Sequence, residues 1–146
     1  MGAVKTSESS PIRRWAYAAA VALLIFAASS RSTVAGPRIE HFDKVVHFSI
    51  YGLLGTLVVR ALGAGRWGRA VLLVSLYGAS DEWHQSFVPG RTSELADWVA
   101  DTLGATVAIA AYSRWAAYRE RLERPLWRRP VAAPLPLAEP IAAPRG

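Results

Sequence analysis

Polar side chains interrupt otherwise apolar stretches of this 146-residue chain, and their types could perform acid–base, cation-binding or phosphate-binding chemistry. Histidine or glutamate can act as a general base, grouped carboxylates can hold a cation, and the planar fork of arginine can bind a phosphate. Residues four apart share one face of a helix, so most of these side chains fall into three stripes. The candidate ligand-binding residues are Asp43, Lys44, His47, Tyr51, Asp81, Glu82, Gln85, Arg91, Asp97 and Asp101.

Two interpretations of these residues compete. In the first, they only pair with one another: Lys44 and Arg91 neutralise two carboxylates, His47 bonds a third, and the network locks helices together. In the second, the carboxylates left over mark a functional site, because closely spaced carboxylates favour a shared proton, a bound cation or general acid/base work. The surplus of carboxylates favours a site. No cofactor is predicted, a divalent cation is compatible with the site, and the residue types fix neither a metal site nor catalytic residues.

The elements that must position these residues are helices long enough to cross a membrane. The chain is 52% hydrophobic, more than a small soluble core needs. Its apolar blocks cover residues 15–30, 45–62, 67–87 and 95–113, and the last three have a length typical of membrane spans. We therefore expect an all-α, polytopic membrane protein, with four transmembrane helices forming one compact bundle over residues 15–113.

The segments on either side of this bundle differ in composition. Residues 1–14 are expected to form a cytoplasmic N-terminus. Residues 114–146 are first basic and then rich in Pro and Ala, which predicts a disordered cytoplasmic tail. The first apolar block is short, follows a pair of arginines and ends in small residues, so a cleaved signal peptide is the alternative to a first membrane helix.

Lysine and arginine residues are distributed unevenly between the two expected sides of the membrane. Thirteen of the 17 lie in the N-terminus, the connection around residues 60–69 and the tail, and four lie in the two remaining connections. The positive-inside rule then places both termini in the cytoplasm and the connections at residues 31–44 and 88–94 outside. Because helix 2 begins outside and helix 3 ends outside, the candidate residues gather at the outer ends of helices 2, 3 and 4.

Composition also excludes some classes of function. The net charge of +6 could indicate nucleic-acid binding, but the basic residues lie between apolar blocks and do not interleave with aromatic residues on one face, so no nucleic-acid partner is expected. The chain has no cysteine, which excludes disulfides, thiolate metal sites and cysteine nucleophiles.

Two motifs are similar to those of a known family. They are D-K-x-x-H-F at residues 43–48 and D-E-x-x-Q-x-F-x-P-G-R at residues 81–91, followed by Asp97 and Asp101. Over residues 43–110 the chain resembles the VanZ-like family, although Asp101 stands where we would expect an asparagine. The resemblance implies a multi-pass protein of the bacterial plasma membrane, linked with the cell envelope and, in some members, with susceptibility to the glycopeptide teicoplanin. It brings no established catalytic mechanism.

Three hypotheses of function follow. The first is a site for a membrane lipid or lipid-linked cell-wall precursor, bound by His47, Glu82, Gln85, Arg91 and Asp97. The second is a membrane-embedded hydrolase or transferase acting on a lipid-linked phosphate, although G-x-S-x-G and H-E-x-x-H motifs are missing. The third is an ion- or proton-coupled transporter. The sequence does not determine the oligomeric state.

Overall fold

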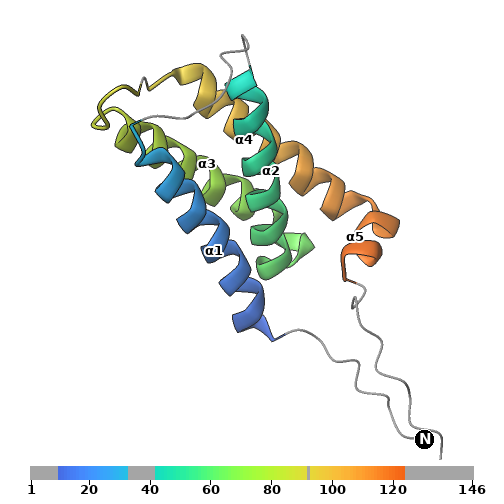
Figure 1. Ribbon diagram of the computed structural model, residues 1–146. Coiled ribbons are helices and arrows are strands. Elements are labelled where there is room, and N and C mark those ends of the chain that lie inside the picture. Colours follow the sequence, from blue (N-terminus) through green and yellow to red (C-terminus); the bar gives the residue numbers. More distant parts are fainter. Residues whose placement is uncertain (1–9, 33–41, 92, 124–146) are drawn as a thin grey trace, which may run out of the picture.

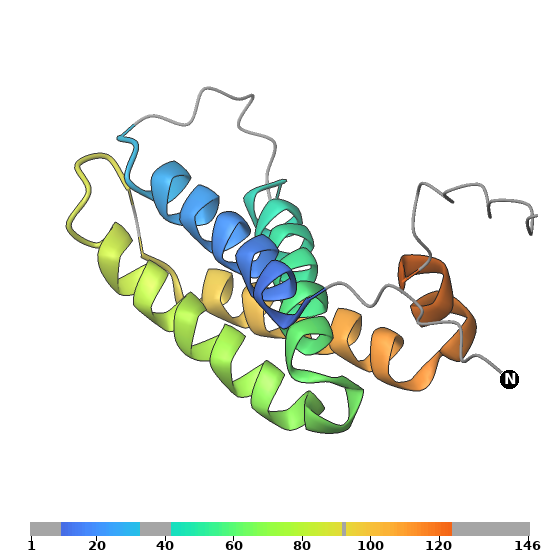
Figure 2. The same ribbon diagram turned by 90° about the horizontal axis from the view of Figure 1, so that it is seen from below.

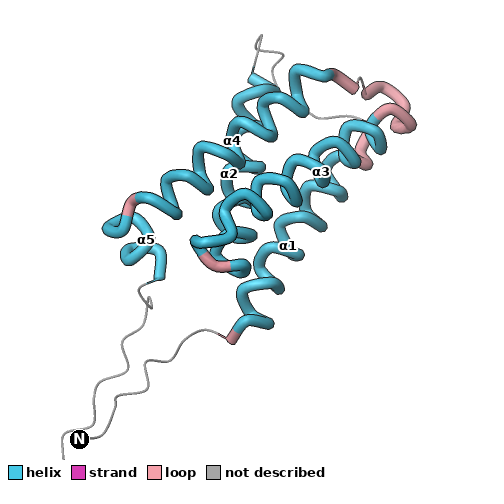
Figure 3. The backbone as a smooth tube through the Cα atoms, turned by 180° about the vertical axis from the view of Figure 1, so that it is seen from behind, coloured by secondary structure: helices cyan, strands magenta, loops and turns pink. Residues whose placement is uncertain are grey.

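The computed structural model describes residues 10–32, 42–91 and 93–123, and every regular element among them is helical. These elements are α1 (Pro11–Ser29), α2 (Phe42–Leu62), the 3-10 turn η1 (Ala64–Arg66), α3 (Trp67–Gln85), α4 (Leu95–Arg114) and α5 (Ala116–Glu123) (Figure 1). Figure 3 shows the same chain as helices joined by loops. The prediction of an all-α fold is confirmed for the described residues.

The first two helices begin earlier than predicted. α1 begins at Pro11, four residues before the expected start, because Ser10 caps it by accepting a hydrogen bond from the Arg13 amide, and proline suits the first helical position. With 19 residues it is about 28 Å long at about 1.5 Å per residue, so it is not a short helix. α2 begins at Phe42, which places Asp43 and Lys44 in its first turn.

α2 lies at the centre of the bundle. It contacts α1 and α3 and packs most extensively against α4, and Figure 2 shows it crossing between its neighbours. α1 and α3 end, and α2 and α4 begin, at the same end of the bundle, uppermost in Figure 1. We call this end, marked by Ser29, Asp43, Gln85 and Leu95, the polar end. The predicted site residues come from helix ends that share this location.

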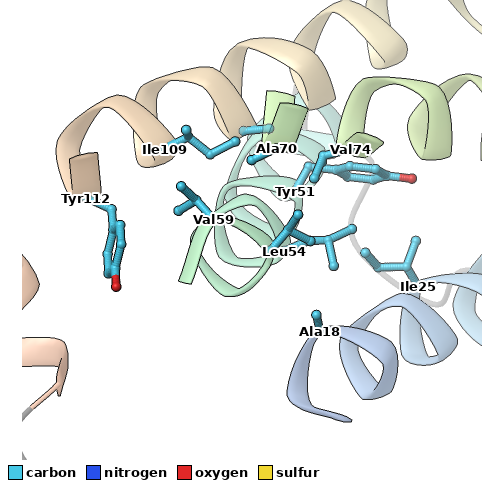
Figure 4. Close-up of a cluster of buried hydrophobic side chains, with 11 residues drawn as sticks. Ala18, Ile25, Tyr51, Leu54, Val59, Ala70, Val74, Ile109 and Tyr112 are labelled. Atoms are coloured by element: carbon cyan, nitrogen blue, oxygen red, sulfur yellow. The ribbon is translucent and has the colours of Figure 1, made fainter. Parts of the chain in front are cut away.

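Apolar side chains lie both inside and outside the bundle. Tyr51, Val59, Val74 and Ile109 are almost fully buried in the core (Figure 4). Large apolar side chains are also exposed on the outward faces, among them Leu23, Leu24, Leu72, Leu76, Leu103 and Val107. Helices that are apolar on every side are typical of membrane spans or of the interior of large proteins.

Two of the described helical segments, Pro11–Ser29 and Asp43–Leu62, are long and apolar enough to cross a membrane. A signal sequence or the core helix of a soluble protein can meet the same criteria. A core helix is mostly buried, however, whereas only 17% and 33% of the apolar windows of these two segments are buried. α3 and α4 do not meet these criteria, and each carries two buried acidic residues. Their crossing of the membrane stays a prediction.

Small residues allow α2 and α4 to approach closely. A Cβ atom added at Gly55 would lie 3.0 Å from the Ala105 Cα atom, and one added at Gly104 would overlap the carbonyl oxygen of Phe48. Glycine at such positions lets two backbones touch, which is the usual packing device of membrane helices. Gly104 therefore sets how closely, and at which register, α4 lies against α2.

We predict that Gly104→Ala lowers the free energy of unfolding by about 1–3 kcal/mol, the usual effect of overpacking a closely packed contact. Gly68→Ala is the matched control, because a Cβ atom there meets nothing within 4 Å. It should leave stability unchanged or raise it slightly, since alanine is the better helix former. Unfolding of the detergent-purified protein by SDS or heat measures both variants, and equal stability of the two would contradict the close contact.

The opposite end of the bundle is closed by α5, which folds back from the end of α4 (Figure 2). Glu123 accepts hydrogen bonds from Arg60 at 2.6 and 3.1 Å, from the Tyr112 hydroxyl at 2.9 Å and from Arg14 at 3.4 Å. The prediction of a disordered tail is thus wrong for residues 116–123, because these bonds give a short polar helix tertiary partners. Residues 124–146 lie outside the described residues.

Glu123 makes the stability of this end depend on pH. Partial burial alone would raise the pKa of Glu123, but the hydrogen bonds from Arg60 and Tyr112 outweigh it and lower the pKa below the ordinary value of 4.5. A carboxyl group whose pKa is lower in the folded state stabilises the fold above its unfolded pKa, and this contribution is lost as the pH falls through the folded pKa.

We predict that Glu123→Gln destabilises the protein at neutral pH, and that the difference from the wild type shrinks toward zero as the pH falls below about 4.5. Thermal unfolding of both proteins across pH measures this difference. Glu120→Gln, an exposed carboxylate on the same helix, controls for the loss of one negative charge. A difference that persisted unchanged in acid would contradict the assigned ion pairs.

Candidate functional site at the polar end of the bundle

Four carboxyl groups are buried at the polar end. Asp81 and Glu82 come from the last turns of α3, Asp97 and Asp101 come from the first turns of α4, and each residue is less than one-tenth exposed. We call these four residues the acidic cluster. Acidic residues are seldom buried to this extent unless they are paired or bind a cation, so each hydrogen bond in the cluster matters.

Asp81 joins three helices through one oxygen atom. Its Oδ2 accepts hydrogen bonds from the Ser29 hydroxyl of α1 at 2.8 Å, the Tyr51 hydroxyl of α2 at 3.1 Å and the Gln85 side-chain amide at 3.0 Å. Asp81 and Gln85, which lie four residues apart and share one face of α3, thus meet Tyr51 of α2. Because Ser29 also bonds to Asp81, α1 is tied into the bundle.

His47 and Asp101 form a close pair across the α2–α4 contact, with 2.9 Å between Nδ1 of the histidine and Oδ1 of the aspartate. Asp101 is fully buried and packs against Gly78, where an added Cβ atom would lie 3.2 Å from its other carboxylate oxygen. When the carboxylate is ionised it only accepts, so Nδ1 carries the proton and donates it. Nε2 of His47 is then the nitrogen that can take up a proton or a metal.

Lys44 brings a positive charge to the acidic cluster. Its Nζ atom lies 3.1 Å from a carboxylate oxygen of Asp97, 3.1 Å from one of Glu94 and 3.3 Å from one of Asp43. Asp97 is buried, whereas the side chain of Asp43 is 54% exposed. Asp43 therefore lies at the rim of the site, and Lys44 connects that rim to the acidic cluster.

Three carboxylate oxygens of the acidic cluster are buried without a hydrogen-bond partner among the described residues: Asp81 Oδ1, Glu82 Oε1 and Asp101 Oδ2. The second oxygen of Glu82 accepts a bond from the Glu94 backbone amide at 3.0 Å. Buried polar atoms in native proteins are almost always satisfied, so an unsatisfied group calls for an explanation. A proton, a water molecule, a cation or a bound ligand would satisfy each of these oxygens.

His47, Glu82 and Asp97 come from three different helices and converge. Each offers one ligand atom, and these atoms all lie within 4.8 Å of one another. An imidazole with two carboxylates is a donor set suited to a divalent metal ion. The same residues could also exchange protons with a bound substrate, because a histidine held by a carboxylate is the usual arrangement of a general base.

Arg91 lies apart from the acidic cluster. Its guanidinium donates to the Ala28 carbonyl at 2.9 Å and to the Arg31 carbonyl at 3.2 Å, so it binds the carbonyl groups at the end of α1. The expected pairing of Arg91 with a carboxylate is not seen among the described residues. Nine of the ten predicted site residues thus lie at the polar end in three hydrogen-bonded groups, and Arg91 lies beside them. The groups are Asp81 with Tyr51 and Gln85, His47 with Asp101, and Lys44 with Asp43, Asp97 and, through Glu94, Glu82.

Two residues of these groups were not predicted. Ser29 bonds to Asp81, and Glu94 bonds to both Lys44 and Glu82. The predicted topology contained the signal that could have identified them, because helix 1 ends on the same side as helix 3 and helix 4 begins there. Any polar residue within a turn of those ends was a candidate.

An apolar cavity of about 270 Å³ lies between α1, α2 and α3, nearer the middle of the bundle. Its walls include Ala18, Ala22, Leu54, Val74 and Tyr77. The described residues that line it include no carboxylate or imidazole, so this cavity offers neither acid–base nor ion-binding groups.

The fold and the site together define a small helical protein with membrane character and buried ionisable residues at one end. A family model described as VanZ/LLP1 matches residues 4–116, so the chain belongs to the VanZ/LLP1 family and the resemblance is confirmed. The match is longer than the 43–110 expected from the motifs and includes α1. Searches of the curated proteins and of the solved structures found no match.

Proposed function

We propose that this VanZ/LLP1 protein spans the bacterial plasma membrane four times and binds, at the outer side, the headgroup of a membrane lipid or lipid-linked cell-wall precursor. The three unpartnered carboxylate oxygens carry the proposal, because they leave the site incomplete. Carboxylate oxygens of this kind suit a ligand that brings further positive charge or hydrogen-bond donors.

The position of the acidic cluster supports a headgroup as the ligand. The cluster lies within about two turns of the helix ends, the depth at which a spanning bundle meets the headgroup region. The distribution of Lys and Arg, with 13 of 17 on the other side, favours an outward-facing polar end. In this orientation the exposed leucines of α1, α3 and α4 face lipid.

The negative charge of the site limits which ligands it can bind. Four buried carboxyl groups face Lys44 and His47, so an anionic phosphate would be repelled unless a cation came with it. Arg91, the residue first expected to bind a phosphate, is engaged by the end of α1. The ligand therefore carries an ammonium group, or a phosphate bridged by a cation.

The His47–Asp101 pair supports an enzyme as the second candidate function, because it resembles an oriented general base. A hydrolase or transferase acting on a lipid-linked phosphate would use Nε2 of His47 to activate water or an acceptor hydroxyl. Release of phosphate or headgroup by the purified protein, lost in Asp101→Asn, would favour the enzyme over the binding protein.

We predict that expressing the protein in a glycopeptide-susceptible bacterium reduces susceptibility to teicoplanin, and that Glu82→Gln returns it to the level of the empty vector. Glu82 is one of three buried residues with an unpartnered carboxylate oxygen, and the amide removes its charge at nearly constant shape. Glu120→Gln, on the exposed surface of α5, should behave as the wild type. Vancomycin is tested in parallel.

The amount of each variant in the membrane is measured alongside. If the wild type is well inserted and no envelope phenotype appears, or if Glu120→Gln abolishes the phenotype as completely as Glu82→Gln, the proposed role of the acidic cluster is contradicted.

A further inference from the structure

His47 and two residues of the acidic cluster have the arrangement of metal ligands, which the proposed function does not itself require. His47 of α2, Glu82 of α3 and Asp97 of α4 bring one nitrogen and two oxygens within 4.8 Å of one another. Metal–ligand distances of about 2.0–2.2 Å place ligand atoms up to about 4.4 Å apart, so small side-chain movements would complete a coordination sphere.

Glu82 provides an independent sign that this site binds a ligand. The residue is 5% exposed, and its Oε1 atom is buried without a partner among the described residues, while Oε2 is held by the Glu94 amide. A carboxylate fixed through one oxygen, with the other oxygen free in a buried site, has the form of a monodentate metal ligand. Buried carboxylate oxygens in native proteins are almost always satisfied, so Oε1 calls for a partner.

His47 is also held as metal-binding histidines usually are. Its Nδ1 atom lies 2.9 Å from Asp101, which fixes the ring and its tautomer and leaves Nε2 available. Carboxylate–histidine–metal chains of this kind are the usual support of metal-ligating histidines, and removing the supporting carboxylate typically weakens metal binding 10- to 100-fold. Lys44, on one oxygen of Asp97, fixes the third ligand in the same manner.

We propose that the acidic cluster binds a divalent first-row transition metal, Zn²⁺ or Mn²⁺, through His47, Glu82 and Asp97, with Asp101 as the residue that positions His47. One imidazole with two carboxylates suits these ions better than Ca²⁺ or Mg²⁺, which prefer oxygen alone. The ion would leave at least one coordination position open for an oxygen of a ligand. The inference deepens the proposed function, because such an ion supplies the positive charge that a phosphate-bearing headgroup needs.

The test uses the full-length protein purified in detergent, with Zn²⁺ or Mn²⁺ alone as the probe. We expect about one equivalent of metal per chain after incubation with the ion and desalting, and an upward shift of the unfolding temperature on adding metal to the chelator-treated protein. His47→Gln and Glu82→Gln should lose the bound metal and the temperature shift. Asp101→Asn should retain the site with affinity weakened 10- to 100-fold.

His84→Gln is the matched control, because His84 lies on the same helix as Glu82 but contacts Ser30 and Phe26. It should bind metal as the wild type does. A wild-type protein that retains no metal and gains no thermal stability from it overturns the proposal, as does an equal loss in His84→Gln. The wild-type measurements test the proposed metal binding even if a variant fails to fold.

The metal site and the proposed function can fail separately. Metal binding by the wild type together with no effect of Glu82→Gln on glycopeptide susceptibility would leave the metal site and remove the envelope role. A phenotype that depends on Glu82 in a protein that binds neither ion would remove the metal and leave the headgroup site.

Discussion

The structure depends on one electrostatic constraint: four carboxyl groups are buried at one end of an apolar bundle that offers few positive charges to balance them. Taking a carboxylate out of water costs several kcal/mol unless it is hydrogen-bonded or paired. Residues from the helices around the cluster offset this cost by donating hydrogen bonds to the carboxylates or pairing with them. α1 contributes Ser29, α2 contributes Lys44, His47 and Tyr51, and the start of α4 contributes the Glu94 amide. Even so, three of the carboxylate oxygens have no hydrogen-bond partner among the described residues.

The close contact of α2 with α4 makes this network possible. Gly104 lets the backbone of α4 touch the carbonyl of Phe48, and His47 is the neighbour of Phe48 in the sequence. Asp101 lies three residues before Gly104, almost one turn toward the polar end, so the same contact that packs the helices brings Asp101 to His47. On α3, Gly78 also has no side chain, and this leaves room for Asp101. Packing and site geometry therefore have a common origin in a few small residues.

Much of this arrangement followed from the sequence, and the exceptions have physical causes. Apolar blocks of membrane-span length predicted four long helices, and the predicted topology placed the candidate residues together at one end of the bundle, where the structure has them. That this end lies outside the membrane stays a prediction. The expected pairing of Arg91 with a carboxylate rested on charge alone. In the structure its guanidinium donates to carbonyl groups at the end of α1 instead. Helix α5 was missed because its stability comes from Glu123 binding distant Arg60 and Tyr112, a contact that a local pattern does not contain. Which oxygens stay unpartnered depends on side-chain geometry and could not be predicted at all.

The central claim is that this bundle crosses the membrane with its polar end outside. The chain has no cysteine, so single cysteines introduced at two exposed loop positions report the topology without a background. Ser93→Cys lies in the connection before α4, and Gly65→Cys lies in η1 at the opposite end. In intact cells a membrane-impermeant maleimide should label Ser93→Cys and not Gly65→Cys, which should react only after the membrane is opened. Labelling of Gly65→Cys alone, or equal labelling of both in intact cells, would contradict the account.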